Sequence, residues 1–505
     1  MGTKTYDSAT DMITFSRASG GTALRKVSYG NELVTNGDFS SGSTGWAVQG
    51  GWTFAGGKAT NDGTNDWSLQ QTNLVTVGKT YSISFDVIDY VSGNISVGLN
   101  SGGGSTAVSA NGSYVVTETA TETYFKGYPR STFVGSIDNV SVKEVTFDQA
   151  DGTLELFNHP ANIPRIEYDA ASAVKGLLIE EARTNLVTYS EDFTNAAWVD
   201  STPVIVTPNQ AVSPDGTQNA DSVELVSNGD YKYQLSAVSA STQYSFSWYI
   251  KAGTATVHVY GFYDQSNAAW VDQTKYTITD GESVGNGWYR VTKTVTTPVG
   301  CTSLRIYPLR TNDSVGYDPD TIGTSILYGA QFEVGSFASS YIPTSGASAT
   351  RAADVATIPT SAFGYNDAAG TVVVEAQRFG TNVYPRSVMI DSGSEADSIG
   401  LGAWGLLTSL SSLIKVGNVA QASMNTGNVG TSAFKNSLAY KENDFAASRD
   451  GGAVLTDTSG VVPTGLTTLR IGRNALKEQF FNGHIKSIQY YPRRLSNAQL
   501  QELTT

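Results

Sequence analysis

Two ten-residue stretches, GKTYSISFDV (78–87) and STQYSFSWYI (241–250), decide the fold class of this chain. In each stretch the apolar side chains occupy every second position, starting at Tyr81 in the first and at Tyr244 in the second. A two-residue period with one apolar face is typical of a half-buried β-strand. The two stretches also match each other, which indicates an internal repeat.

The repeat extends on both sides of these strands. Upstream, NGDFSSGSTGW (36–46) matches SEDFTNAAW (190–198), since each places Asp-Phe shortly before a tryptophan. Downstream, SIDNVSVKEV (136–145) matches SILYGAQFEV (325–334). Each copy has room for about eight short strands, so the sequence predicts two antiparallel β-sandwiches of the jelly-roll type.

The chain of 505 residues is long enough for three or four domains of about 100–200 residues each. We expect a first jelly-roll domain at 36–145, a second at 190–351 and a further β-sandwich at 352–505. Residues 1–35 and 146–189 flank the first domain and are too long for a plain linker. They are predicted to form one split connector that docks or aligns the chain.

The composition favours an all-β protein. Charged residues make up 15% of the chain, against about 25% in ordinary domains, while glycines number 52 and tyrosines 26. Glycine suits tight turns, and aromatic and β-branched residues suit strands. The one persuasive helix is LSNAQLQEL (495–503), with Ser496 as its expected N-cap.

Charge and hydropathy exclude two classes of partner. The net charge is −14 and no run of Lys or Arg occurs, whereas nucleic-acid binding needs clustered cations. No stretch approaches the roughly 18 apolar residues of a membrane span, and the N-terminus lacks the apolar core of a signal peptide. We therefore expect no nucleic acid, no membrane insertion, and synthesis in a cytoplasm.

The side chains that carry catalysis or bind metals form no recognisable motif. Cys301 is the only cysteine, which excludes an intrachain disulfide and favours a buried, inert thiol. The three histidines are far apart in the sequence: His159, His258 and His484. No nucleophile elbow, zinc-protease motif or phosphate loop is present. No catalytic residue is predicted.

An adjacent pair of carboxylates, Glu180 and Glu181, is the most conspicuous acidic feature. A glycosidase needs two carboxyl groups about 5–10 Å apart on one site. Adjacent residues of a strand face opposite ways, so we expect these two to pair structurally with Arg165 or Arg183.

Several long segments resemble a known family of proteins. ITFSRASGGT (13–22), IPRIEYDAASAVKGLLIEEARTNLVTYSEDFTNAAW (163–198) and YGAQFEVGSFASSYIPTSGASATRAAD (328–354) resemble phage tail-fibre and head-spike fibre proteins, including those of gene-transfer particles. The NGDF…IDNVSV copy looks like a carbohydrate-binding-module jelly roll. TLRIGR…LSNAQLQEL (468–503) is similar to concanavalin A-like and laminin-G-like sandwiches.

The resemblance implies a non-enzymatic fibre subunit on a virion surface that binds host polysaccharide or lipopolysaccharide for adsorption. It also implies a homo-oligomer, most simply a trimer, with the N-terminal region contacting other virion proteins. Two alternatives stay open: a polysaccharide depolymerase on the same scaffold, and a purely structural capsid or tail decoration protein.

Candidate glycan contacts are found by subtraction. Five of the eight tryptophans are explained by the repeat or by strand positions and are expected in the core: Trp46, Trp52, Trp198, Trp248 and Trp288. Trp67, Trp270 and Trp404 remain beside polar or glycine-rich turns, and Tyr263 lies near Trp270. Flat aromatic rings bind the C–H faces of sugars, so these four residues are the predicted carbohydrate contacts.

A structural calcium ion is the only cofactor that we consider. Jelly-roll modules often hold Ca²⁺ between early and late strands, and Asp38 and Asp138 occupy such positions. Asp, Asn and Gly in these loops are also ordinary turn residues, so both interpretations stay open.

Overall fold

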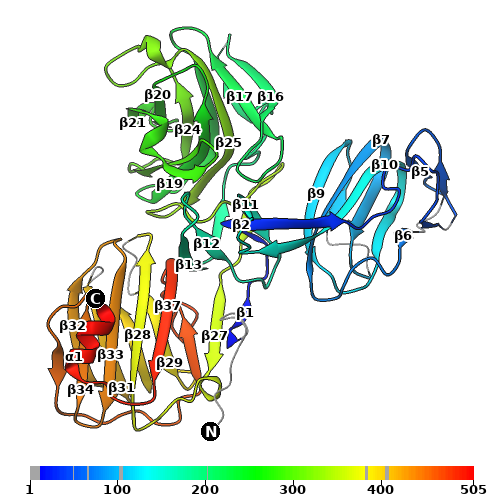
Figure 1. The fold of residues 1–505 in the computed structure, drawn as a ribbon. Coiled ribbons are helices and arrows are strands. Elements are labelled where there is room, and N and C mark those ends of the chain that lie inside the picture. The colour runs from blue at the N-terminus through cyan, green and yellow to red at the C-terminus, as the bar shows by residue number, and fades with distance from the viewer. Residues whose placement is uncertain are drawn as a thin grey trace. The chain divides into compact units, whose positions relative to one another are not determined.

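The computed structural model describes residues 12–48, 50–64, 68–101, 106–201, 203–380, 385–403 and 409–505. The chain forms two compact units (Figure 1). One is Arg25–Leu154, and the other joins the residues up to Leu24 with Glu155–Thr505. The predicted all-β class and its antiparallel sheets are confirmed within the described residues.

The unit Arg25–Leu154 is built on two long antiparallel strands, β7 (Thr80–Gly98) and β10 (Phe125–Phe147). Each contributes one half to each layer of a sandwich. One layer has the order β3-β6-β10-β7-β8 and the other β4-β5-β10-β7-β9. The shorter strands are β3 (Ala47–Val48), β4 (Trp52–Phe54), β5 (Ala59–Asp62), β6 (Leu69–Gln71), β8 (Thr106–Val108) and β9 (Gly112–Thr119).

The bend between the two layers has a local cause in β10. Its pairing with β7 changes register between Arg130 and Val134, and Thr132 takes a left-handed φ of 59°. A bulge of this kind redirects a strand. Apolar side chains of both halves then share one core, including Val97 and Phe125 from one layer and Phe85 from the other.

The second sandwich repeats both of these strand orders and has one additional strand at the edge of its second sheet. Its first sheet runs β15 (Trp198–Asp200), β18 (Tyr231–Ala237), β24 (Ser303–Arg310), β20 (His258–Asp264), β21 (Ala269–Tyr276). Its second sheet runs β16 (Ile205–Ala211), β17 (Ala220–Leu225), β25 (Gly323–Val334), β19 (Gln243–Ala252), β23 (Trp288–Thr296), β22 (Glu282–Gly285). The long β7 and β10 correspond here to the separate pairs β19/β20 and β24/β25.

Equivalent side chains of the two copies make equivalent hydrogen bonds. Tyr81 Oη accepts from the amide of Thr76 and Tyr244 Oη from the amide of Ser239, both at 2.8 Å and both five residues upstream. The indole N–H of Trp46 and that of Trp198 donate to backbone carbonyls ten and nine residues earlier, of Asn36 and Tyr189. Repeat residues therefore serve the same structural purpose twice.

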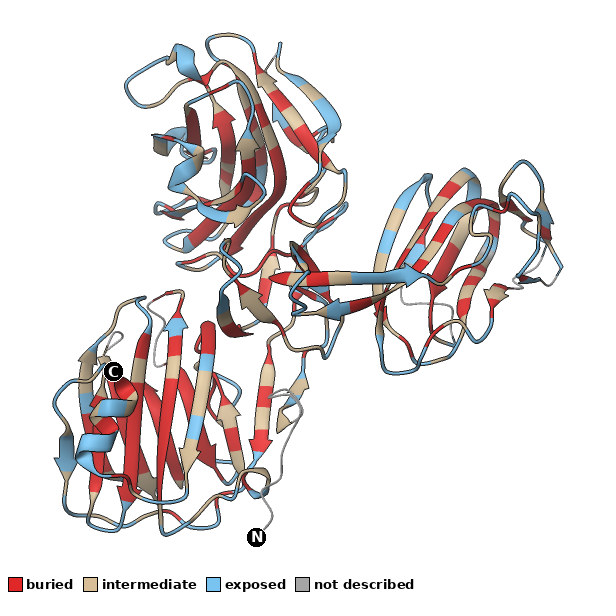
Figure 2. Ribbon diagram, in the orientation of Figure 1, coloured by how far each residue is buried: buried red, intermediate tan, exposed pale blue. Residues whose placement is uncertain are grey.

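The C-terminal sandwich consists of two seven-stranded sheets. One runs β1 (Thr14–Ser16), β27 (Val355–Pro359), β36 (Thr468–Ile471), β29 (Arg386–Asp391), β30 (Ser398–Ala403), β31 (Ser409–Val416), β32 (Val419–Asn428). The other runs β12 (Ile166–Tyr168), β13 (Val174–Ile179), β37 (Gly483–Tyr491), β28 (Ala369–Arg378), β33 (Phe434–Lys441), β34 (Phe445–Arg449), β35 (Leu455–Asp457). Figure 2 shows the buried residues concentrated along the strands of each sandwich.

The segments predicted as a connector take part in these sheets. Thr14–Ser16 pairs with β27, and Leu177–Ile179 pairs with β37, so this sandwich extends beyond residues 352–505. β14 (Arg183–Asn185) pairs with β26 (Ala349–Arg351). β2 (Gly21–Glu32) and β11 (Thr153–His159) each begin in one unit and end in the other.

Helices are short in the described part of the chain. The α-helix α1 (Asn497–Thr504) is closed by a reciprocal capping box between Ser496 and Gln499, as predicted. Three single 3₁₀ turns are η2 (Ile278–Asp280), η3 (Pro319–Thr321) and η4 (Thr360–Ala362). No described helix has the length and apolar character needed to cross a membrane.

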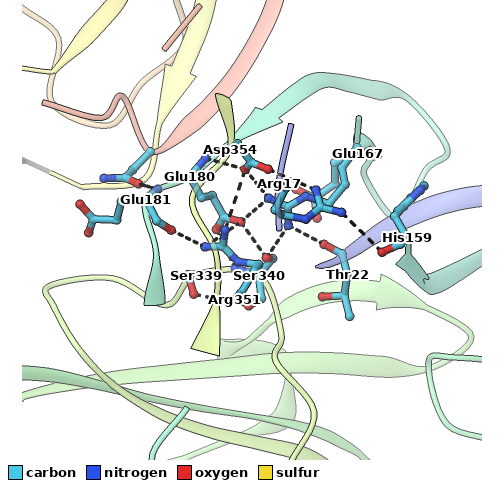
Figure 3. A network of polar contacts seen from close by, with 12 residues as sticks. Arg17, Thr22, His159, Glu167, Glu180, Glu181, Ser339, Ser340, Arg351 and Asp354 are labelled. Carbon is cyan, nitrogen blue, oxygen red and sulfur yellow. Dashed lines mark hydrogen bonds and ion pairs between the residues drawn. The ribbon is translucent and has the colours of Figure 1, made fainter. Parts of the chain in front are cut away.

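A fully buried ion cluster joins the N-terminal segment, the connector and the strand region after the second sandwich (Figure 3). Arg165 Nη2 contacts Glu180 Oε2 at 2.9 Å and Asp354 Oδ2 at 2.6 Å. Arg17 binds the other oxygen of Asp354 at 3.2 Å, and Arg351 lies 3.4 Å from Glu180. The predicted pairing of Glu180 with Arg165 is confirmed.

The carboxylate of Glu180 is held ionised by this cluster. Burial alone raises its pKa, but Arg351 and Arg165 oppose burial, together with two hydrogen bonds from Ser340 at 2.7 Å. The net effect lowers the pKa of Glu180 to about 2. Glu181 points away and pairs with Arg183 at 2.7 Å, so the two carboxylates have different partners, as predicted.

We expect the substitution Glu180→Gln to remove a pH-dependent part of the stability. The folded-state pKa of about 2 lies below the ordinary value of 4.5, so the stabilisation is fully present above about pH 4.5 and is lost as the pH falls towards 2. The free energy of unfolding should drop by about 3 kcal/mol at pH 7, and the deficit should shrink in acid. Urea unfolding between pH 7 and pH 3 measures both. Glu181→Gln is the matched control, and an equal deficit at every pH would contradict the account.

The paired tyrosines give a second prediction. Tyr81→Phe and Tyr244→Phe each remove the acceptor for one backbone amide, so each should lower the free energy of unfolding by about 1–2 kcal/mol. The two losses should be similar because the two contacts are equivalent. Thermal unfolding of both variants checks this, with Tyr317→Phe as an exposed control. Loss at only one position would mean that the repeat contacts differ.

Candidate functional site

The outer face of the five-stranded sheet in the second sandwich gathers aromatic and arginine side chains. Along β24, Leu304 and Ile306 point into the core, so the alternate residues Arg305 and Tyr307 lie on the opposite face. We call the following set the aromatic–arginine face: Tyr231, Tyr233, Tyr263, Trp270, Arg305, Tyr307 and Arg310.

The rings of this face form a continuous series of contacts. Trp270 lies 5.0 Å from the Tyr263 ring and 5.3 Å from the Tyr307 ring, and Tyr307 lies 5.0 Å from Tyr233. The backbone explains the first contact, because Tyr263 and Trp270 are directly opposite across β20 and β21. Trp270 remains 38% exposed, so part of its ring is available to a ligand.

Both arginines lie over the rings. The guanidinium carbon of Arg310 is 3.9 Å from the centre of the Trp270 ring, and that of Arg305 is 4.6 Å from Tyr233 and 5.4 Å from Tyr263. Such cation–π contacts hold the guanidinium groups in defined positions. Burial lowers the pKa of Arg310, against the opposing influences of Tyr307 and Asp313.

A glycine makes the close packing possible. A Cβ at Gly261 would lie 3.0 Å from Cζ3 of Trp270 and 3.4 Å from both Cδ of Arg310 and Cδ2 of Tyr307. The tryptophan therefore lies directly on the backbone of β20, next to the arginine. The missing side chain in HVYGFYD is the local reason that this indole rests on the sheet.

The face encloses a shallow cavity of about 250 Å³. Its lining comes from the sheet and from two loop residues at one end: Gly229, Tyr231, Tyr263, Trp270, Arg305, Tyr307, Arg310 and Asn312. Exposed aromatic surface, amide groups and cations thus converge on one volume, the combination that a polar ligand with apolar faces requires.

A larger cavity of about 480 Å³ lies elsewhere in the same unit, and three of its charged side chains take part in ion pairs. Lys175 binds Glu282, and Glu167 binds His484. Its two lining tyrosines, Tyr168 and Tyr249, are buried. None of its described lining aromatic rings is exposed in the way that Trp270 is on the aromatic–arginine face.

The structure brings together two of the four predicted glycan contacts, Tyr263 and Trp270. Trp67 and Trp404 lie outside the described residues. The five tryptophans assigned to the core are buried, which confirms that assignment: Trp46, Trp52, Trp198, Trp248 and Trp288. Sequence reasoning missed the other five residues of the face, although the alternation in SLRIYPLR could have indicated Arg305 and Tyr307. The five are Tyr231, Tyr233, Arg305, Tyr307 and Arg310.

The two predicted calcium ligands make local hydrogen bonds, Asp38 in a turn and Asp138 within β10. Asp38 accepts from the amide and the hydroxyl of Ser40, and Asp192 at the equivalent repeat position does the same with Thr194. Asp138 accepts from the amide of Asn139, and its pKa is raised chiefly by burial. No group of three metal-binding side chains occurs in the described part of the chain. Calcium binding stays a prediction.

Several other titratable side chains are buried or hydrogen-bonded within the protein. His258 is buried, contacts Ser325 Oγ at 3.0 Å, and has its pKa lowered by burial to about 4. Cys301 is buried as predicted, and burial raises its pKa to about 11. Glu191 and Asp215 are the most suggestive carboxylate pair, since both accept from the hydroxyl of Tyr328.

No protein-family model matches the chain, and no curated protein matches it. Among solved structures, the IT-sialidase CBM40 of Ruminococcus gnavus bound to alpha2,3 sialyllactose is 16% identical over 28% of this chain and 84% of that one, with a TM-score of 0.25. A tailspike protein 4 domain of bacteriophage CBA120 is 18% identical over 30% of this chain and 21% of that one, with a TM-score of 0.22. Domains LG4-5 of mouse laminin alpha1 are 11% identical over 66% of this chain and 94% of that one, with a TM-score of 0.21. At these scores the similarities assign neither a family nor a ligand to this chain.

The different surroundings of two tryptophans predict different losses of stability. Trp270→Ala should lower the free energy of unfolding by no more than about 1 kcal/mol, because its side chain is partly exposed. Trp248→Ala empties a fully buried site and should cost about 3–5 kcal/mol. Denaturant unfolding followed by circular dichroism compares them. A large loss in Trp270→Ala would show that this residue is part of the core.

Proposed function

We propose that this chain is a non-enzymatic binding protein for surface polysaccharide and that the aromatic–arginine face is its binding site. The observation that carries the proposal is the partly exposed Trp270 ring, set among Tyr263, Tyr307 and the two arginines over one cavity. The same residues belong to a rigid sheet, which lowers the entropic cost of binding.

The chemistry of the face matches that of a sugar. Pyranose rings have apolar C–H faces that pack on aromatic rings, and their hydroxyl groups accept and donate hydrogen bonds. Trp270 offers the apolar platform, while Asn312 and the guanidinium groups line the same cavity. A cavity of about 250 Å³ suits one residue of a longer glycan.

The biological role that we propose is adsorption of a virion to its host. The chain would be a tail-fibre or head-spike fibre subunit, displayed on the virion surface as a homo-oligomer, most simply a trimer. Support comes from the resemblance of residues 13–22, 163–198 and 328–354 to such fibres. Several weak sites on one particle can raise avidity by about 10²–10⁴.

A depolymerase is the alternative with a specific observation in its favour. Burial and the neighbouring Asp215 raise the pKa of Glu191 to about 6, a value suited to proton transfer near neutral pH. Glu191, however, already accepts hydrogen bonds from Tyr328 and Tyr341 at 3.0 and 2.9 Å. We therefore favour a structural role for this pair. Release of reducing ends from purified capsular polysaccharide would decide for the enzyme.

The binding proposal is tested by Trp270→Ala on an array of bacterial surface polysaccharides. Loss of an aromatic platform should weaken binding about tenfold, which corresponds to 1–2 kcal/mol, without changing the melting temperature by more than a few degrees. Tyr317→Ala is the matched control, because Tyr317 is similarly exposed, at 41%, and does not line the cavity. Unchanged binding by Trp270→Ala, or equal loss by both variants, would contradict the proposed site.

A further inference from the structure

We infer that the ligand of the aromatic–arginine face carries a carboxylate, as in polysaccharides that contain uronic or sialic-type sugar acids, and that Arg305 and Arg310 bind it. This inference rests on the proposed function and adds the chemical class of the glycan. The geometry that carries it is a pair of guanidinium groups on adjoining rings of one cavity.

Neither arginine has a carboxylate partner among the described residues. Arg305 makes one long hydrogen bond of 3.5 Å, to the hydroxyl of Tyr307, and Arg310 makes one of 2.5 Å, to the side-chain carbonyl of Gln273. Asp313 influences the pKa of Arg310, but its carboxylate also binds Lys275 and the amides of Val315 and Gly316. Most of the donor capacity of the two guanidinium groups is therefore uncommitted.

Two lysines of this sandwich have acidic partners, whereas Lys251, Arg290 and Lys293 lie over aromatic rings. Lys232 binds Asp200 at 2.8 Å, and Lys275 binds Asp318 at 2.8 Å. The chain as a whole has a net charge of −14, so positive groups without acidic partners stand out against their surroundings. Arg305 and Arg310 line one cavity and have no acidic partner among its described lining residues, so this cavity is suited to an anion.

The aromatic contacts orient the guanidinium groups for a planar acid. A guanidinium group that lies over a ring has its N–H donors in its own plane, directed past the ring edge. The guanidinium carbon of Arg310 lies 3.9 Å from the centre of the Trp270 ring, so the guanidinium group lies next to the exposed indole. A carboxylate is planar and accepts two parallel N–H donors, so it fits this fork, whereas a neutral hydroxymethyl group makes at most one such contact.

If ring stacking were the whole purpose of the arginines, neutral and acidic sugars would bind equally well. The test therefore uses matched probes on the full chain: oligogalacturonate against its methyl ester, and a sialylated oligosaccharide against the methyl ester of its sialic acid. Each pair differs at the carboxylate and shares the rest of the glycan. Isothermal titration calorimetry at two salt concentrations measures the affinities.

For wild type we expect at least one acidic probe to bind about ten to a hundred times more tightly than its neutral counterpart, as is usual for a charge-assisted contact. This preference should decrease as salt rises, because the cavity is open to solvent. Arg305→Gln and Arg310→Gln should remove the preference and leave weak binding of the neutral probe. Arg305→Lys should retain only part of it, because lysine keeps the charge and loses the planar fork.

The control removes a cation from the equivalent strand of the first sandwich. Lys126 precedes Tyr128 and Pro129 on β10 as Arg305 precedes Tyr307 and Pro308 on β24, and it lies 4.8 Å from the Tyr128 ring. Lys126→Gln should therefore leave the acidic preference unchanged. If Lys126→Gln removed it, the anion would bind the first sandwich and the inference would be wrong.

Failure of the inference and failure of the proposed function give different results. Suppose that Trp270→Ala weakens binding of both members of a probe pair, while Arg305→Gln and Arg310→Gln leave the ratio of acidic to neutral affinity unchanged. The face then binds glycans without recognising the carboxylate, and only the inference is wrong. The inference is likewise wrong, and the proposed site is not, if the wild-type chain binds only neutral glycans. If Trp270→Ala leaves every affinity unchanged, the proposed site itself is wrong. Melting temperatures of all variants show that each is folded.

Discussion

The structure of the larger unit depends on one buried set of charges. Arg165 lies between Glu180 and Asp354, and all three are fully buried together with Arg17 and Arg351. Removing several ions from water is costly, and the cost is offset only when every charge has partners. Because the partners come from residues near 17, 165, 180 and 354, the cluster forms only when these distant segments have come together. The cluster therefore acts mainly by selecting which segments pack together, and it contributes less to the net free energy of unfolding.

The ion cluster and two strand pairings make the connector segments part of the folded larger unit. β1 completes one sheet of the C-terminal sandwich and β13 joins the other, while Arg17 and Arg165 from the same segments enter the cluster. The chain can carry the unit Arg25–Leu154 as an insertion because the residues on both sides of it are fixed in the same unit. The candidate binding face also belongs to the larger unit, where it lies on a five-stranded sheet.

Fold and candidate site share the same strands, and the two-residue period explains what could be predicted. The alternation in YSFSWYI identified the core residues, and the repeated Asp-Phe…Trp pattern identified two related sandwiches. Arg165 and Glu180 could be paired from charge alone. Trp270 and Tyr263 could be proposed because no strand pattern explained them, and they lie opposite each other. Arg305, Arg310 and Tyr233 could not be joined to them, since the order β18-β24-β20-β21 brings together residues up to about eighty positions apart and no local pattern encodes it. The participation of Thr14–Ser16 in a C-terminal sheet is non-local for the same reason.

The central claim is that an acidic glycan binds on the aromatic–arginine face, and a crystal structure of the chain with an acidic oligosaccharide tests it most directly. The account predicts a sugar ring packed on Trp270, with its carboxylate within hydrogen-bonding distance of Arg305 or Arg310. Electron density for the sugar at any other surface, with the indole of Trp270 left uncovered, would contradict it.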